Sequence, residues 1–168
     1  MTESIAAKQV KKITVLGIGN TLYTDEGIGV HVLPQLEKAL NEFEDIEIIE
    51  GATDGIRLLE PVEDTDLLLI IDAINAGKEP GTLIVLRDDE IPSYFGIKMS
   101  IHQLGFQEVL HAARFRERLP EQMIMFGVQP DSLDFGIGLS EAVEEQIPAL
   151  ISSIKTQIQQ WRSMDEPA

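Results

Sequence analysis

The chain has 168 residues, with 29 acidic and 13 basic side chains and a formal net charge of −16. This length fits one domain with a sizeable core, so we expect a single domain over residues 1–168, ordered from about 12 to 161 between mobile polar ends. The absence of Cys excludes disulfides, thiolate metal sites and cysteine nucleophiles. The acidic charge disfavours nucleic acids and anionic lipid surfaces as partners. With no apolar run of ~20 residues and no secretory signal pattern, a cytoplasmic protein is expected.

Strand-like and helix-like patterns alternate along the sequence. Short apolar runs predict five strands, at residues 12–18, 46–49, 66–72, 82–86 and 123–128. Helical spacing of apolar residues predicts helices at about 27–43, 56–59, 101–115 and 140–161. Pro34 should bend the first helix or start its regular part, and Pro148 should kink the last one.

This alternation predicts an α/β fold. We expect a three-layer sandwich in which helices cover both faces of a twisted, mostly parallel five-stranded mixed sheet. The continuous apolar run at 66–72 is typical of a central strand. The third and fourth strands are joined directly by the turn at 75–81, which suggests one antiparallel strand.

Gly17 and Gly19 follow the first strand and invite a dinucleotide-binding interpretation. The fingerprint requires a third glycine three residues later, where this chain has Leu22. The sequence also lacks the phosphate-loop motif, His-Glu-x-x-His and Gly-x-Ser-x-Gly. A nucleotide or small-ligand module therefore stays as a weaker alternative.

Three polar residues fall where a site is expected in such a sheet. Ligands bind beyond the carboxyl ends of parallel strands. Glu26 lies in the loop after the first strand, Asp72 ends the third, and His102 opens a helix after the fourth. If the first and third strands are parallel neighbours, both carboxylates share one edge and His102 can join them. Two carboxylates and one imidazole make a three-ligand divalent metal site with open positions.

The position of His102 favours this hypothesis. Ser100 and Gln103 fit a capping box, which places His102 in the first turn of its helix. The positive end of the helix dipole disfavours the imidazolium, so the ring is expected to stay neutral and able to bind a cation.

Each of the three candidate metal ligands also has a purely structural explanation, which stays open. Glu26 suits the first turn of a helix, Asp72 suits the cap of the next turn, and His102 suits a helix end. His31 and His111 lie inside helical patterns and are expected to serve surface or packing roles.

Three segments, residues 17–29, 71–74 and 100–105, carry a family resemblance. They read Gly-Ile-Gly-Asn-Thr-Leu-Tyr-Thr-Asp-Glu-Gly-Ile-Gly, Ile-Asp-Ala-Ile and Ser-Ile-His-Gln-Leu-Gly. They resemble the signatures of the [NiFe]-hydrogenase maturation endopeptidases, in the same order and at similar intervals. The resemblance implies a small cytoplasmic α/β protein that removes a C-terminal extension from the nickel-loaded large-subunit precursor. It also implies that Glu26, Asp72 and His102 bind the metal.

The resemblance also covers the segment Glu50-Gly51-Ala52-Thr53. In the family this segment often reads Asp-Gly-Gly-Thr and is linked with substrate choice, so Glu50 and Ala52 depart from the pattern. We expect these four residues to take part in substrate recognition, although Thr53 and Asp54 also suit an ordinary helix N-cap.

Two functions that involve the hydrogenase precursor remain open, beside the weaker nucleotide or small-ligand module. The leading one is an endopeptidase whose nickel arrives with the substrate, with other divalent cations able to substitute in vitro. The alternative is a nickel-binding chaperone or insertion factor that touches the same precursor without cutting it. No nucleophilic side chain is evident, so the catalytic residues are unknown and metal-assisted attack by water is assumed.

Overall fold

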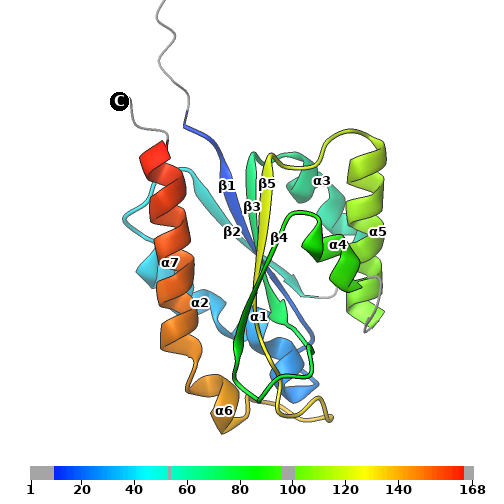
Figure 1. Cartoon of the computed structure of the whole chain (residues 1–168), viewed down its shortest axis with the longest axis vertical. Helices are drawn as coiled ribbons and strands as arrows, with labels where there is room; N and C mark the ends of the chain where they lie inside the picture. The colour runs from blue at the N-terminus through cyan, green and yellow to red at the C-terminus, as the bar shows by residue number, and fades with distance from the viewer. Residues whose placement is uncertain (1–9, 53, 96–100, 165–168) are drawn as a thin grey trace, which may run out of the picture.

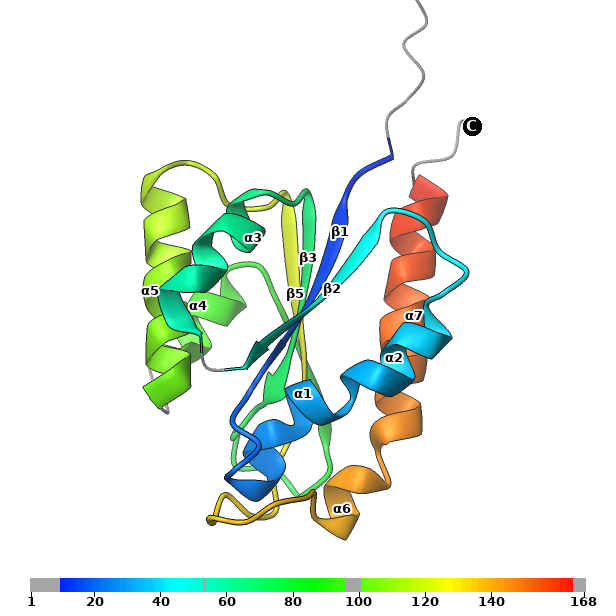
Figure 2. The same cartoon turned by 180° about the vertical axis from the view of Figure 1, so that it is seen from behind.

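The structure is a computed structural model that describes residues 10–52, 54–95 and 101–164, with Phe95 and residues 101–104 described by their backbone alone. Five strands form one sheet between two layers of helices (Figures 1 and 2). The strands are β1 (Ile13–Ile18), β2 (Ile46–Ala52), β3 (Leu67–Ala73), β4 (Leu83–Arg87) and β5 (Gln122–Val128). The predicted three-layer α/β sandwich with a mostly parallel sheet is confirmed.

The strand order is β2-β1-β3-β5-β4, and only β4 runs antiparallel to its neighbour. The predicted antiparallel strand therefore exists, but it pairs with β5 and not with β3, which precedes it in the chain. All seven residues of β3 are buried, and parallel strands with both faces covered suit such a run. The half-exposed β4 occupies an edge, where burial is incomplete.

Successive side chains of a strand point to opposite faces of the sheet, so a separate hydrophobic core lies on each face. Leu67, Leu69 and Ile71 of β3 face one core, while Leu68 and Ile70 face the other. The first core lies beneath α1 (Ile28–His31), α2 (Leu33–Ala39), α6 (Glu141–Glu144) and α7 (Ile147–Met164). The second lies beneath η2 (Gly55–Leu58), α3 (Leu59–Glu63), α4 (Glu90–Phe95) and α5 (Ile101–Phe115). Figure 1 shows α7 and α5 on opposite sides of the sheet.

Pro34 and Pro148, the two prolines expected to disturb helices, each lie near the beginning of a regular helix. Pro34 occupies the first turn of α2, so it starts the regular part of the first helical region. The last helix was expected to run unbroken from Ser140 with a kink at Pro148. Instead α6 ends at Glu144 and α7 begins at Ile147. Pro148 lacks a backbone donor, which is tolerated only in a first turn.

Two further features differ from expectation. Helix α4 was not predicted, and it buries Ile91 against the core beneath α5. Helix α7 continues beyond Trp161, and the Arg162 guanidinium donates to the carbonyl oxygens of Lys11 at 2.8 Å and Glu44 at 2.9 Å. Within the described ranges, no helix is long and apolar enough to cross a membrane.

Candidate active site

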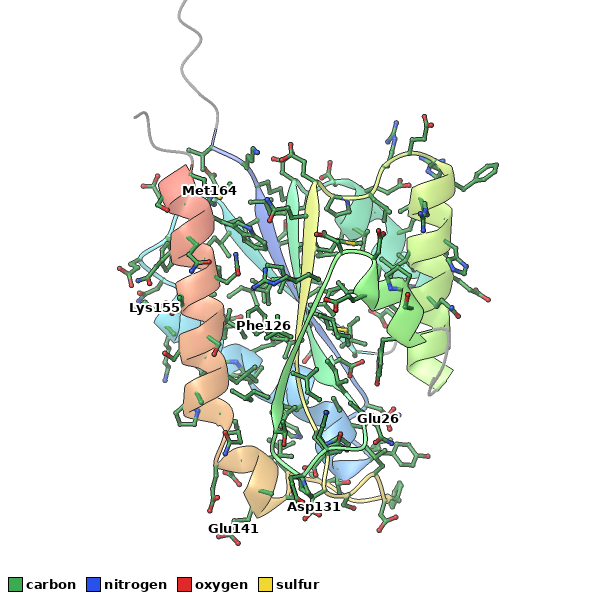
Figure 3. All side chains as sticks on the ribbon, viewed as in Figure 1. Glu26, Phe126, Asp131, Glu141, Lys155 and Met164 are labelled. Atoms are coloured by element: carbon green, nitrogen blue, oxygen red, sulfur yellow. The ribbon has the colours of Figure 1, made fainter. Side chains whose placement is uncertain are left out.

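The site edge is formed by the segments that follow the three parallel strands β1, β3 and β5. These are the β1 loop (residues 19–27, including the 3-10 helix η1, Thr24–Gly27), the β3 loop (residues 74–82) and the β5 loop (residues 129–139). Because parallel strands end at the same edge, these loops meet there. The sticks in Figure 3 show Glu26 of the β1 loop and Asp131 of the β5 loop at this end of the molecule.

Glycines let the β1 loop lie directly on the strand ends. A Cβ on Gly17 would strike the carbonyl oxygen of Gly29, and one on Gly19 would strike the carbonyl oxygen of Glu26. A Cβ on Gly29 would strike the carbonyl oxygen of Ile71 on β3. These glycines are explained by close backbone packing, which weakens the nucleotide-binding alternative.

This packing positions Glu26. The residue lies in η1, which contacts β3, and its side chain is half-buried. Its backbone is held over the end of β1 by the contact with Gly19. The expected position of Glu26 at the sheet edge, beside β1 and β3, is therefore confirmed.

Asp72 is fully buried in β3, where its Oδ1 atom accepts a hydrogen bond of 2.8 Å from the Ala73 backbone N–H. By the alternation of the strand, its side chain lies on the same face as Leu68 and Ile70. That face is covered by α5, whose Phe106 packs into the same core. β1 and β3 are parallel neighbours, as the site hypothesis required.

His102 is the second residue of α5, and its side chain lies outside the described residues, as does Ser100. The backbone places the first turns of α5 beside η2, which follows the end of β2, because a Cβ on Gly105 would lie 3.2 Å from the Cα atom of Gly55. The start of α5 thus lies at the carboxyl edge, on the face of the sheet that holds the Asp72 side chain. The convergence of Glu26, Asp72 and His102 on one metal stays a prediction.

Among the side chains that the structure describes, no group of three His, Asp or Glu residues could hold a metal ion. The side chain of His102 lies outside the described residues, so this absence does not bear on the trio of Glu26, Asp72 and His102. His111 is exposed on α5, and His31 is half-buried beside Gly27, in accord with the surface and packing roles expected.

Asp25 is a site residue that sequence reasoning missed. Its carboxylate is fully buried and accepts hydrogen bonds from the backbone N–H groups of Asp131 (2.8 Å), Ser132 (3.0 Å) and Ser140 (2.7 Å). The hydroxyl of Ser140, the residue that caps the start of α6, donates to it as well at 2.7 Å. Asp25 thus fastens the β5 loop to the β1 loop, one residue before Glu26. Because Asp25 and Glu26 are adjacent acidic residues, the sequence did not indicate which of the two carboxylates is buried.

Gln129 makes a second connection among these loops. Its buried side-chain oxygen accepts from the backbone N–H groups of Ala76 at 2.8 Å and Lys78 at 3.1 Å. Its amide nitrogen donates to the Asn75 side-chain oxygen at 3.1 Å. The β3 loop, which follows Asp72, is therefore fixed to the β5 loop. Two buried polar side chains hold the whole edge in one arrangement.

The segment expected to recognise substrate lies at the end of β2. Glu50 is exposed, Gly51 is buried against Leu16 and Leu58, and Thr53 lies outside the described residues. Ala52 has a φ of +45°, in the left-handed region that favours glycine. Its departure from the family's Gly therefore places a side chain on a strained backbone.

Comparison with known proteins identifies the family. The family model described as "Hydrogenase maturation protease" matches residues 30–157. The chain belongs to the hydrogenase maturation protease family. It is 45% identical over 141 residues to the "Hydrogenase 2 maturation protease" of Escherichia coli strain K12, covering 83% of this chain and 86% of that protein.

Other relatives of this maturation protease agree. The "Hydrogenase expression/formation protein HupD" of Rhizobium leguminosarum is 43% identical over 152 residues, covering 89% of this chain and 75% of that protein. The solved hydrogenase maturating endopeptidase HybD from E. coli superposes with a TM-score of 0.81 at 39% identity, covering 89% of this chain and 93% of that one. The resemblance seen in the sequence is confirmed, and the hydrolase function is favoured over a non-proteolytic chaperone.

Proposed function

We propose that this maturation protease removes the C-terminal extension of a nickel-loaded [NiFe]-hydrogenase large-subunit precursor in the cytoplasm. The observation that supports it is the placement of Glu26 and Asp72 at one edge of two parallel neighbouring strands, with α5 beginning on the face that carries Asp72. The precursor is the partner, and its nickel is part of the substrate. Glu26, Asp72 and His102 bind that nickel.

The chemistry of these ligands favours a metal that arrives with the substrate. Two hard carboxylates and one imidazole, without a thiolate, give modest affinity for nickel on their own. Groups of the precursor fill the remaining coordination positions, so the metal bridges the two proteins. Nickel then reports that the precursor is loaded, because an empty precursor shares no ligand with the protease.

Peptide-bond cleavage follows the ordinary course of hydrolysis. A water oxygen attacks the scissile carbonyl carbon, the C–N bond breaks, and the leaving amine takes a proton. Glu26, Asp72 and His102 would hold the precursor's nickel, which would orient the precursor and supply Lewis acidity at the scissile carbonyl. We assign no nucleophilic side chain. Glu50, Gly51, Ala52 and Thr53, at the end of β2, contribute to the choice of precursor.

The intact mass of the precursor tests this function. Wild-type protein is incubated with purified nickel-loaded precursor, and in parallel with precursor prepared without nickel in the presence of a chelator. We expect loss of one C-terminal fragment from the loaded precursor alone. A loaded precursor that keeps its full mass would exclude the protease function, and efficient cleavage of the nickel-free precursor would exclude the nickel-bridged mechanism.

A further inference from the structure

The β1 and β5 loops together display an unusual set of exposed apolar side chains. Phe135 is 77% exposed and Ile137 is 85% exposed, both on the β5 loop. Leu22, Tyr23 and Leu133 are also exposed, and the rings of Tyr23 and Phe135 meet edge to face with centroids 5.9 Å apart. We call these five residues the loop patch. Exposed apolar side chains gathered on neighbouring loops are typical of interaction sites.

The backbone beneath the loop patch is firmly held. Gly136 donates to the carbonyl oxygen of Leu22 at 2.8 Å and accepts from the Thr24 N–H at 2.9 Å, which forms a short parallel bridge between the loops. The Thr24 hydroxyl donates to the Ser132 carbonyl oxygen at 2.7 Å, and Asp25 fastens the same loop from below. Thr24 has a φ of +46°, a strained value for a β-branched residue that these contacts maintain. The apolar side chains are thus presented on a pre-organised surface.

The charge around the loop patch has one sign. Residues 19–27 and 129–141 contain five carboxylates and no Lys or Arg. Asp25 is buried and its carboxylate accepts four hydrogen bonds, but Asp131, Asp134 and Glu141 are exposed. The adjoining β3 loop adds Lys78 and Glu79, which balance each other. Such a surface suits a partner that combines apolar side chains with cationic ones.

The loop patch adjoins the proposed active site, because the backbone N–H of Glu26 donates to the carbonyl oxygen of Tyr23 at 3.0 Å. On these grounds the geometry points to the loop patch as the docking surface for the precursor segment beside the scissile bond. This inference rests on the proposed function. The segment it fits carries large apolar side chains together with Lys or Arg. Docking there holds the precursor chain against the edge where its nickel meets Glu26 and Asp72.

The double substitution Phe135→Ser and Ile137→Ser tests this inference, since both side chains are largely exposed and their loss spares the core. Phe115→Ser is the matched control, because Phe115 is 90% exposed at the end of α5, which leads to the opposite edge of the sheet where β5 begins. KM and kcat are measured with nickel-loaded precursor, and Kd is measured on immobilised precursor. We expect KM and Kd to rise about tenfold or more, equivalent to about 1.4 kcal/mol, with kcat within about twofold of wild type and the control unchanged.

Neutralising Asp131 and Asp134 with Asn tests the charge argument. We expect a weaker Kd at low salt and a smaller dependence of Kd on salt concentration than in wild type. Unchanged KM and Kd in the double variant would overturn the inference, as would a fall in kcat alone. So would sedimentation showing that the patch joins two copies of this chain while precursor binding stays unchanged. If wild type binds but does not cut the precursor, the proposed function fails, and Kd still decides the docking surface.

Discussion

The carboxylate of Asp25 accepts hydrogen bonds from both the backbone N–H and the hydroxyl of Ser140, each 2.7 Å long and spanning 115 residues of sequence. Together with the bonds from Asp131 and Ser132, they join the loop after the first strand to the loop after the fifth. Glu26 follows Asp25 directly, so the stability of this junction and the placement of a proposed metal ligand are linked. The buried carboxylate of Asp25 therefore supports the position of Glu26, the proposed metal ligand.

Asp25→Ala is expected to lower the free energy of unfolding by about 3 to 5 kcal/mol, because several buried N–H groups lose their acceptor at once. Asp25→Asn should cost less, since one oxygen remains, but its amide group would face a donor. Urea denaturation followed by circular dichroism measures both. Asp134→Ala, an exposed carboxylate on the same loop, should stay within about 0.5 kcal/mol of wild type. Equal stability of Asp25→Ala and Asp134→Ala would show that the junction is unimportant.

Gly29→Ala should destabilise the protein by about 3 kcal/mol or more, because its Cβ would overlap the carbonyl oxygens of Ile18 and Ile71, and backbone cannot move aside cheaply. Gly77→Ala is the control. It also lies at this edge, with a φ of +69°, but an added Cβ would have nothing within 4 Å. We expect it to cost about 1 to 2 kcal/mol from the left-handed backbone alone. Thermal unfolding that ranks the two equally would contradict the packing explanation.

The strand positions were predictable because they depend on local patterns. The five residues before Asp72 are all Leu or Ile, and the structure buries them completely. Pro34 likewise acts through its own missing donor, so its place in a first turn followed from chemistry. The positions of Glu26 and Asp72 at one edge followed from the rule for parallel strands.

Features that depend on distant partners were not predictable. The pairing of β4 with β5 is decided by a strand that comes almost 40 residues later in the chain. Asp25 and Glu26 are adjacent acids, and the approach of the β5 loop and Ser140 determines that Asp25 is the buried one. Helix α4 has only six residues with Pro92 inside it, too short for a periodic signal, and the packing of Ile91 supports it.

Ala52→Gly is expected to raise the free energy of unfolding by about 1 kcal/mol, because glycine adopts the observed φ of +45° without a Cβ penalty. The gain is partly offset by the greater freedom of glycine in the unfolded chain. Ala149→Gly, the same change at an exposed position of α7, should instead cost about 0.5 to 1 kcal/mol. Thermal melts of both variants measure whether the first gains stability while the second loses it. A loss of stability in Ala52→Gly would mean that the backbone strain at this position is negligible.

His102→Ala should abolish removal of the C-terminal extension while leaving the free energy of unfolding within about 0.5 kcal/mol of wild type. His102 lies in the first turn of α5, where a metal-binding residue would contribute little to the core, whereas its loss would remove one of the three proposed ligands to the precursor's nickel. His111→Ala, at an exposed position of the same helix, is the control and should process normally. Precursor mass after incubation and thermal melts provide the two readouts. Chelation of the nickel should mimic His102→Ala with wild-type protein, since both remove the same bridge between protease and precursor. Normal processing by His102→Ala would exclude this residue as a required ligand, and a large loss of stability with processing retained would instead assign it a packing role.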